Sequence, residues 1–247
     1  MLVSLRNYSN YSICESNIKI DDLVNFASKN NLSAIGLTDY KLLSGSLEFS
    51  IKCQKAGIQP IIGLDIDYVS TLDHSKRVTF LSKSEEGFKN LNILSTEVNT
   101  NNNFLLNENN IKDYANGNIL ILGGLYSYFE DISVNQKNLS KVLNEIKNLK
   151  EIFKNDLFFE YDPNLNNILL KEVSKKLEIP LFNSFFSFYK SSNDFDAMQI
   201  LHCVKNGEYL QNTTFKIKNN YSLDKSVGSS DNSLVLNNQL IAQKINF

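Results

Sequence analysis

The sequence predicts an α/β fold in which mostly parallel strands close, or nearly close, into a barrel. Short apolar runs alternate along the chain with longer segments whose apolar residues recur at helical spacing, and this alternation is typical of parallel strands joined by crossover helices. With about six such units, a barrel is favoured over an open sheet. The length of 247 residues and the hydrophobic content of 42% suit one large domain with a sizeable core.

The expected strands are short and mainly apolar. They cover residues 2–5, 34–37, 60–69, 78–81, 118–122, 157–161 and 180–183. A polar turn at 73–76 separates the third from the fourth, so these two strands are expected to form an antiparallel hairpin.

The expected helices follow from apolar residues spaced three and four apart. They cover residues 20–30, 43–56, 85–98, 136–153, 165–177 and 194–205. The most polar stretch, 99–110, is predicted to be a surface loop. Residues 1–207 are expected to form the barrel domain, and 208–247 a connector leading out of it, with one more helix at 232–245.

Composition excludes several classes of protein. The net charge is -2 with an isoelectric point near 5.8, so no general basic field exists to hold a nucleic-acid backbone. No apolar run is long enough to span a membrane, and the first residues lack the pattern of a signal peptide. The three cysteines are far apart, which favours buried thiols in a reducing compartment. We expect a cytoplasmic protein.

Three stretches carry a family resemblance in order and spacing. They are LVSLRNYSNYSICES at 2–16, the segment 32–68 with its LTD and AGIQPIIG motifs, and IPLFNSFFSFYKSSNDFDAMQILHCV at 179–204. Together they resemble the PHP (polymerase and histidinol phosphatase) domain at the N-terminus of the bacterial DNA polymerase III alpha subunit. The resemblance implies a distorted (β/α)7-like barrel with mostly parallel strands. It also implies that the Mg²⁺-binding palm of the polymerase lies beyond this segment.

Members of that family hold two or three metal ions with histidines and carboxylates at strand ends, and these ions activate water to cleave phosphoesters. This sequence departs from the pattern almost everywhere. Only Glu15, Asp39 and Asp65 keep an acidic side chain where the family has one. The positions of the family's metal site are occupied here by Arg6, Tyr8, Glu15, Asp39, Tyr40, Asp65, Arg77, Phe186 and Phe188, with Asn164 and Met198 near two further histidine positions.

The residue counts lead to the same expectation. The chain has only two histidines, His74 in a polar turn and His202 in the last barrel helix, and they are not at metal-ligand spacing. We therefore expect no metal and no catalytic residue in this chain. The large side chains of the altered site are expected to converge and fill the space of the metals; they are Tyr8, Tyr40, Phe186, Phe188 and Met198.

The resemblance implies a structural role in DNA replication. The domain would stabilise the rest of the polymerase alpha subunit and dock the proofreading exonuclease (epsilon) subunit, without strong nucleic-acid binding and without a cofactor of its own. Two alternatives remain open at this point. One is a stand-alone PHP-type phosphoesterase with a carboxylate-led site at Glu15, Asp39 and Asp65, and the other is a decayed domain without a partner.

Overall fold

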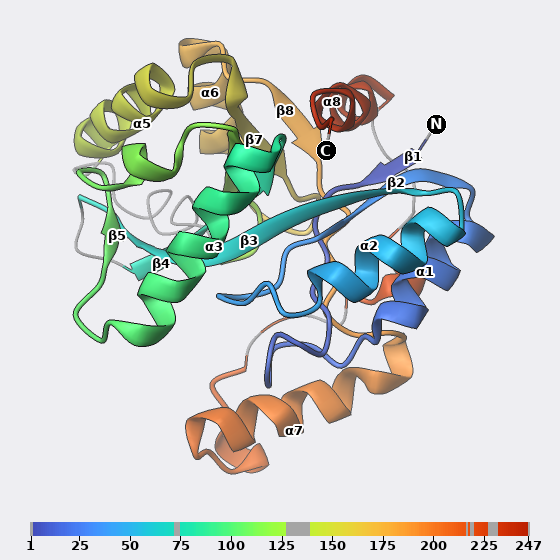
Figure 1. The fold of residues 1–247 in the computed structure, drawn as a ribbon. Helices are drawn as coiled ribbons and strands as arrows, with labels where there is room; N and C mark the ends of the chain where they lie inside the picture. Colours follow the sequence, from blue (N-terminus) through green and yellow to red (C-terminus); the bar gives the residue numbers. More distant parts are fainter. Residues whose placement is uncertain are drawn as a thin grey trace.

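The computed structural model describes residues 2–71, 75–126, 139–215, 217, 220–226 and 232–246. Its strands form one curled sheet in the order β1-β2-β3-β4-β6-β7-β8, with β5 paired to β3 (Figure 1). The strands are β1 (Leu2–Ser4), β2 (Leu32–Leu37), β3 (Gln59–Val69), β4 (Ser75–Ser82), β5 (Leu106–Asn107), β6 (Asn118–Gly123), β7 (Leu157–Tyr161) and β8 (Leu181–Asn183). All described pairings are parallel except β3 with β4 and β4 with β6. The predicted barrel with mostly parallel strands and one central hairpin is confirmed.

The described helices are α1 (Ile20–Lys29), α2 (Ser46–Lys55), α3 (Glu85–Thr100), α5 (Leu139–Phe153), α6 (Ile168–Leu177), α7 (Phe195–Asn206) and α8 (Asn232–Gln243). Helices α1 to α6 cover the outside of the sheet. Buried apolar residues of α1 and α2 pack on β2 and β3, and those of α3, α5 and α6 pack on the second half of the sheet. Helix α7 lies apart from the sheet (Figure 1). No helix in the described part of the chain is long and apolar enough to cross a membrane.

The two edge strands, β1 and β8, are joined indirectly. Just beyond them, the Tyr8 N–H donates to the Ser187 carbonyl at 3.0 Å, and the Ser187 hydroxyl donates to Asn7 Oδ1 at 2.7 Å. Asn238 of α8, fully buried, makes a second connection. Its amide nitrogen donates to the carbonyls of Val3 and Asn183 at 3.2 and 3.0 Å, and its Oδ1 accepts from the Asn183 N–H at 3.0 Å.

Helix α8 completes the interior of the barrel as well. Its Ile241 and Ala242 join the inward-facing residues of the strands, among them Val3 and Phe158, in one buried cluster. Figure 1 shows α8 seated beside β1 and β8. The predicted helix in the tail is therefore present and packs on the barrel, so this part of the tail does not lead away from it. The domain division at residue 207 stays a prediction.

One segment differs from its sequence-based expectation. Residues 99–110 were expected to be surface loop, but α3 continues to Thr100, and Leu106 is buried within β5. The asparagines on either side satisfy the backbone here: Asn110 Oδ1 accepts from the Asn107 N–H at 2.8 Å. The polar side chains of this segment form hydrogen bonds with the nearby main chain. From the sequence alone, such a polar composition predicts a loop. Helices α2 and α6 each begin three residues later than expected.

Candidate functional site

Charged and aromatic side chains gather at the mouth of the barrel, where the parallel strands end. β1 leads into Arg6 and Tyr8, β3 carries Asp65, and β7 carries Glu160. Each of these side chains is at most 2% exposed. Parallel strands bring their carboxyl ends to one edge of a barrel, which is why residues so distant in sequence meet here.

Arg6 lies between two buried carboxylates. Its Nη1 donates to Glu160 Oε2, its Nη2 is 3.3 Å from Asp65 Oδ2, and its guanidinium carbon is 4.7 Å from the centre of the Phe186 ring. Ser184 donates to the other oxygen of Glu160 at 2.6 Å. Burial raises the pKa of Glu160, and the charge of Arg6 opposes that rise. Burial works against the charged form of Arg6, but the two carboxylates outweigh it and raise its pKa.

Tyr8 links this ion pair to a second one. Its hydroxyl donates to Asp65 Oδ2 and accepts from Arg77 Nη1 at 3.1 Å, while Thr79 donates to Asp65 Oδ1 at 2.6 Å. Burial and the neighbouring Asp65 raise the pKa of the Tyr8 phenol, so Tyr8 stays neutral and acts as a donor. The two halves of the mouth therefore form one connected hydrogen-bond network.

Arg77 is the centre of the second half. Its Nη2 is 2.6 Å from Glu15 Oε1, and Lys205 of α7 pairs with the same carboxylate. The guanidinium carbon lies 3.7 Å from the centre of the Tyr40 ring and 4.3 Å from that of Tyr126, so the cation sits against two aromatic rings. Burial alone would raise the pKa of Glu15, but Arg77 and Lys205 hold it below its ordinary value.

Asp39 takes no part in these ion pairs. Its Oδ1 accepts from the Ser9 N–H and the Ser12 hydroxyl, both at 2.6 Å, and its Oδ2 accepts from the Ser9 hydroxyl at 2.7 Å. Burial raises its pKa. Of the three acids that the sequence singled out, Asp65 and Glu15 share the arginine network, whereas Asp39 holds the loop that follows β1.

The aromatic replacements converge as expected. Tyr8, Phe186, Phe188 and Met198 are buried in one cluster, and Tyr40 packs at its edge. The rings of Tyr8 and Phe186 meet edge to face at 4.9 Å between centroids.

The expectation that these rings fill the space of the metals and plug the pocket is wrong. A cavity of about 540 Å³ remains, lined in part by Glu15, Arg77, Tyr126 and Lys205. The space between the buried carboxylates is filled by guanidinium groups instead of rings. The physical reason is charge: retained carboxylates need cationic partners, which apolar side chains cannot supply.

Among the charged residues of the network, sequence reasoning missed Glu160, Asp67 and Lys205. Glu160 carried a signal, because a lone acid inside the apolar run LFFEY must find a buried partner. Asp67, which accepts from the Tyr40 hydroxyl at 2.6 Å, and Lys205 carried none, since only the folded chain brings them to the mouth.

His202 lies outside the network. His202 Nε2 is 2.8 Å from the Asn206 amide nitrogen and 3.3 Å from the Thr214 hydroxyl. Asn164 forms a turn in which its N–H donates to Asp162 Oδ1 at 2.9 Å. His74 falls outside the described residues.

The donor set does not fit a multinuclear metal centre. Arg6 and Arg77 cannot coordinate a cation, and they already pair with Asp65, Glu160 and Glu15. A divalent ion about 4 Å from a guanidinium would meet roughly 8 kcal/mol of repulsion at an effective dielectric constant of about 20. In the part of the chain that the structure describes, no three His, Cys, Asp or Glu side chains are grouped so as to hold a metal ion.

A barrel of mostly parallel strands with a buried polar cluster at their carboxyl ends has the layout of (β/α)-barrel enzymes. A solved structure supports this for the fold alone: an amidohydrolase from Chromobacterium violaceum superposes with a TM-score of 0.54 at 8% identity, covering 81% of this chain and 97% of its own. The chain belongs to the PHP domain family, whose sequence profile matches residues 4–164.

Curated relatives point to one setting for the domain. DNA polymerase III subunit alpha of Borreliella burgdorferi is 30% identical over 228 residues, which is 83% of this chain and 19% of the relative. The same subunit of Buchnera aphidicola is 28% identical over 234 residues, 89% of this chain and 20% of the relative. The same subunit of Rickettsia conorii is 30% identical over 232 residues, which is 86% of this chain and 19% of the relative. The chain therefore spans about a fifth of the length of these relatives.

Proposed function

We propose that this chain serves as the PHP domain of a DNA polymerase III alpha subunit, in which arginine–carboxylate pairs replace the family's metal ions. Its role is to stabilise the rest of the alpha subunit and to present a surface to a partner protein, without hydrolysis and without a metal of its own. The observation that carries the proposal is the position of Arg6, 2% exposed, between the fully buried carboxylates of Asp65 and Glu160.

The ion pairs can do the structural part of a metal ion's work. A metal cluster ties strand ends together through shared carboxylates. Here Arg6 connects β3 to β7 from its place after β1, and Arg77 on β4 connects to Glu15 in the loop that follows β1. The barrel mouth is thus crosslinked by side chains that need no exogenous ligand. General acid–base chemistry is not supported, because each carboxylate of the network is already engaged by a cation or by hydroxyl donors.

Docking is the second part of the proposal. The partners would be the remainder of the alpha subunit and the proofreading exonuclease (epsilon) subunit. Two helices carry large exposed apolar residues one turn apart, Ile200 with Val204 on α7 and Leu236 with Leu240 on α8. Their exposed fractions run from 51% to 68%, and exposed apolar patches of this kind are typical of protein interfaces.

Metal dependence tests the structural part. The purified chain would be dialysed against Zn²⁺ or Mn²⁺, analysed for bound metal by mass spectrometry, and melted with and without EDTA. We expect negligible metal and an unchanged melting temperature. Bound metal at one or more ions per chain, together with hydrolysis of a phosphomonoester, would instead favour the stand-alone phosphoesterase.

Pull-down tests the docking part. The exonuclease subunit encoded by the same genome would be captured on the immobilised chain, with Val204→Asp and, as the matched control, Ile93→Asp at an exposed apolar residue of α3. We expect the first substitution to weaken capture and the second to leave it intact. Absence of capture by the wild-type chain would refute exonuclease docking and leave the structural role standing.

A further inference from the structure

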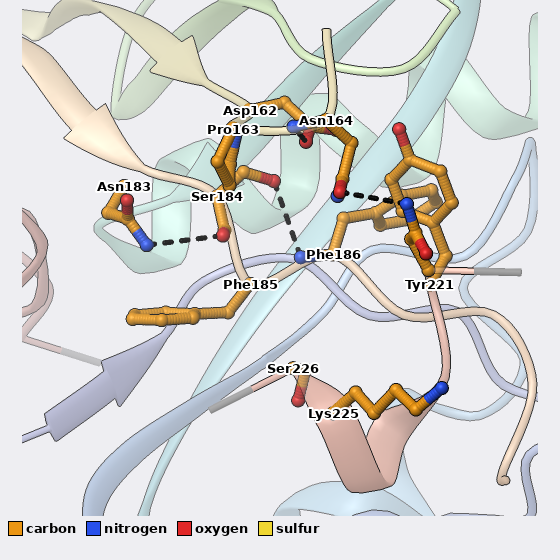
Figure 2. A pocket seen from close by; sticks show the side chains of 11 residues that line it. Asp162, Pro163, Asn164, Asn183, Ser184, Phe185, Phe186, Tyr221, Lys225 and Ser226 are labelled. Carbon is orange, nitrogen blue, oxygen red and sulfur yellow. Dashed lines mark hydrogen bonds between the residues drawn. The ribbon is translucent and has the colours of Figure 1, made fainter. Parts of the chain in front are cut away.

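A separate pocket of about 250 Å³ opens beside the barrel mouth, between the turn after β7 and the segment 220–226 (Figure 2). Polar side chains line most of it, among them Asp162, Asn183, Ser184 and Lys225. None of these four stands at a position of the family's metal site, whereas Asn164 and Phe186, which also line the pocket, lie at or near such positions. The proposed function therefore gives this pocket no role.

Asp162 gives the pocket an unsatisfied acceptor. Its side chain is 1% exposed. Oδ1 accepts from the Asn164 N–H at 2.9 Å, and Oδ2 has no partner of good hydrogen-bond geometry among the described residues, although the nearby Tyr221 side chain opposes the rise that burial gives the Asp162 pKa. A buried carboxylate oxygen without a donor is costly, so a donor from a bound molecule would be favoured here. Amines are suitable because their bonds to a carboxylate are charge-assisted or strongly polarised.

Lys225 supplies the opposite chemistry. In Figure 2 it enters from the other side of the pocket than Asp162, on the short helical turn that precedes Ser226. The Lys225 side chain is exposed, and it belongs to none of the ion pairs found among the described residues. Its ammonium is thus available to an anionic group, and phosphate is a common partner of lysine.

Flat apolar and amide groups lie between these two ends. The buried rings of Phe186 and Tyr221, 6.2 Å apart between centroids, form one wall. The Asn220 amide donates to Asn164 Oδ1 at 3.1 Å, and the Asn183 amide donates to the Ser184 carbonyl at 3.2 Å. Aromatic walls with carboxamide and carboxylate edges are the groups that proteins use to hold nucleobases.

We propose that this pocket binds a nucleoside 5′-monophosphate whose base carries an amino group, with the amine on Asp162 and the phosphate on Lys225. The volume of about 250 Å³ lies just below the roughly 300–1,000 Å³ typical of sites for drug-sized ligands, which suits one small molecule. The proposal is independent of the polymerase setting, because it rests only on the pocket.

Calorimetric titration of the full chain with dCMP, dAMP, dTMP and inorganic phosphate tests it. We expect saturable one-to-one binding of dCMP and dAMP, weaker binding of dTMP, which lacks the exocyclic amine, and no measurable binding of phosphate alone. Lys225→Gln should weaken dCMP about tenfold, the usual scale for one charge-assisted hydrogen bond. Asp162→Asn should remove the preference for dCMP over dTMP. Lys176→Gln, an exposed lysine on α6, is the matched control and should bind as wild type.

Two results would overturn the proposal. One is the absence of saturable heat with dCMP and dAMP at millimolar concentration. The other is unchanged dCMP affinity in Lys225→Gln, whose exposed site makes misfolding no explanation. Thermal melts of both variants accompany the titrations, so that a folding defect in Asp162→Asn is recognised, and Lys225→Gln then decides the outcome.

Discussion

Removal of the Arg6 guanidinium is the sharpest test of the ion-paired barrel mouth. In Arg6→Met, Glu160 keeps only the hydroxyl of Ser184, and Asp65 keeps those of Tyr8 and Thr79. Both carboxylates are fully buried and would lose their cation. Breaking a buried ion pair from one side typically costs about 3–5 kcal/mol of unfolding free energy. We expect a loss of this size in urea denaturation at neutral pH.

The control is an ion pair of the opposite kind. Lys89 Nζ is 3.0 Å from Glu85 Oε1 on the surface of α3, with side chains 62% and 78% exposed. Lys89→Met should therefore cost only about 0–1 kcal/mol. Adding Glu160→Met to Arg6→Met should recover part of the loss, because an apolar pair of similar size replaces an unpaired charge. A cost below about 1 kcal/mol for Arg6→Met would refute the crosslinking role.

The pH dependence of Arg6→Met has a definite sign. Burial already raises the pKa of Glu160, and Arg6 opposes that rise, so loss of Arg6 raises it further. A group whose pKa is higher in the folded state stabilises the fold at low pH and loses that contribution as the pH rises through the folded value. The variant should therefore be closest to wild type in mild acid and furthest from it at pH 8. The opposite trend would show that Glu160 is not the residue left unpaired.

Three further outcomes follow from the same structure. Asn238→Leu leaves the polar groups of Val3 and Asn183 without partners between the edge strands and should cost at least about 2 kcal/mol in urea denaturation, whereas the exposed Gln243→Leu should change little. The pKa of Glu15 is held low, so this carboxylate stabilises the fold above its ordinary pKa of 4.5, and the stabilisation is lost as the pH falls through the lower pKa of the folded state. The difference in unfolding free energy between wild type and Glu15→Gln should therefore shrink in acid. A difference that stays constant with pH would contradict the pairing. Tyr8→Phe removes the link between the two arginine pairs and should cost about 1–3 kcal/mol without changing the fold seen by circular dichroism.

Much of the fold could be predicted from the sequence. Strand and helix periodicity placed the barrel strands and the central hairpin, because each element repeats its own local pattern whatever its neighbours are. The short strand around Leu106 could not be predicted, because its asparagine-rich composition is typical of a loop, whereas in the structure the asparagines form hydrogen bonds with the local backbone. The position of α8 could not be predicted from the sequence either. Asn238 is an ordinary polar residue in the sequence, and only the folded chain places it between β1 and β8.

The sequence by itself determined that the family's histidines are missing and that arginine and aromatic residues stand in their places. It could not determine what those replacements do, because the partners of Arg6 lie 59 and 154 positions away along the chain. Only the tertiary structure decided that Arg6 and Arg77 neutralise Asp65, Glu160 and Glu15. The physical reason is that pairing energy depends on distance and burial in space, whereas sequence pattern reports only the local backbone and the side of an element that faces the core.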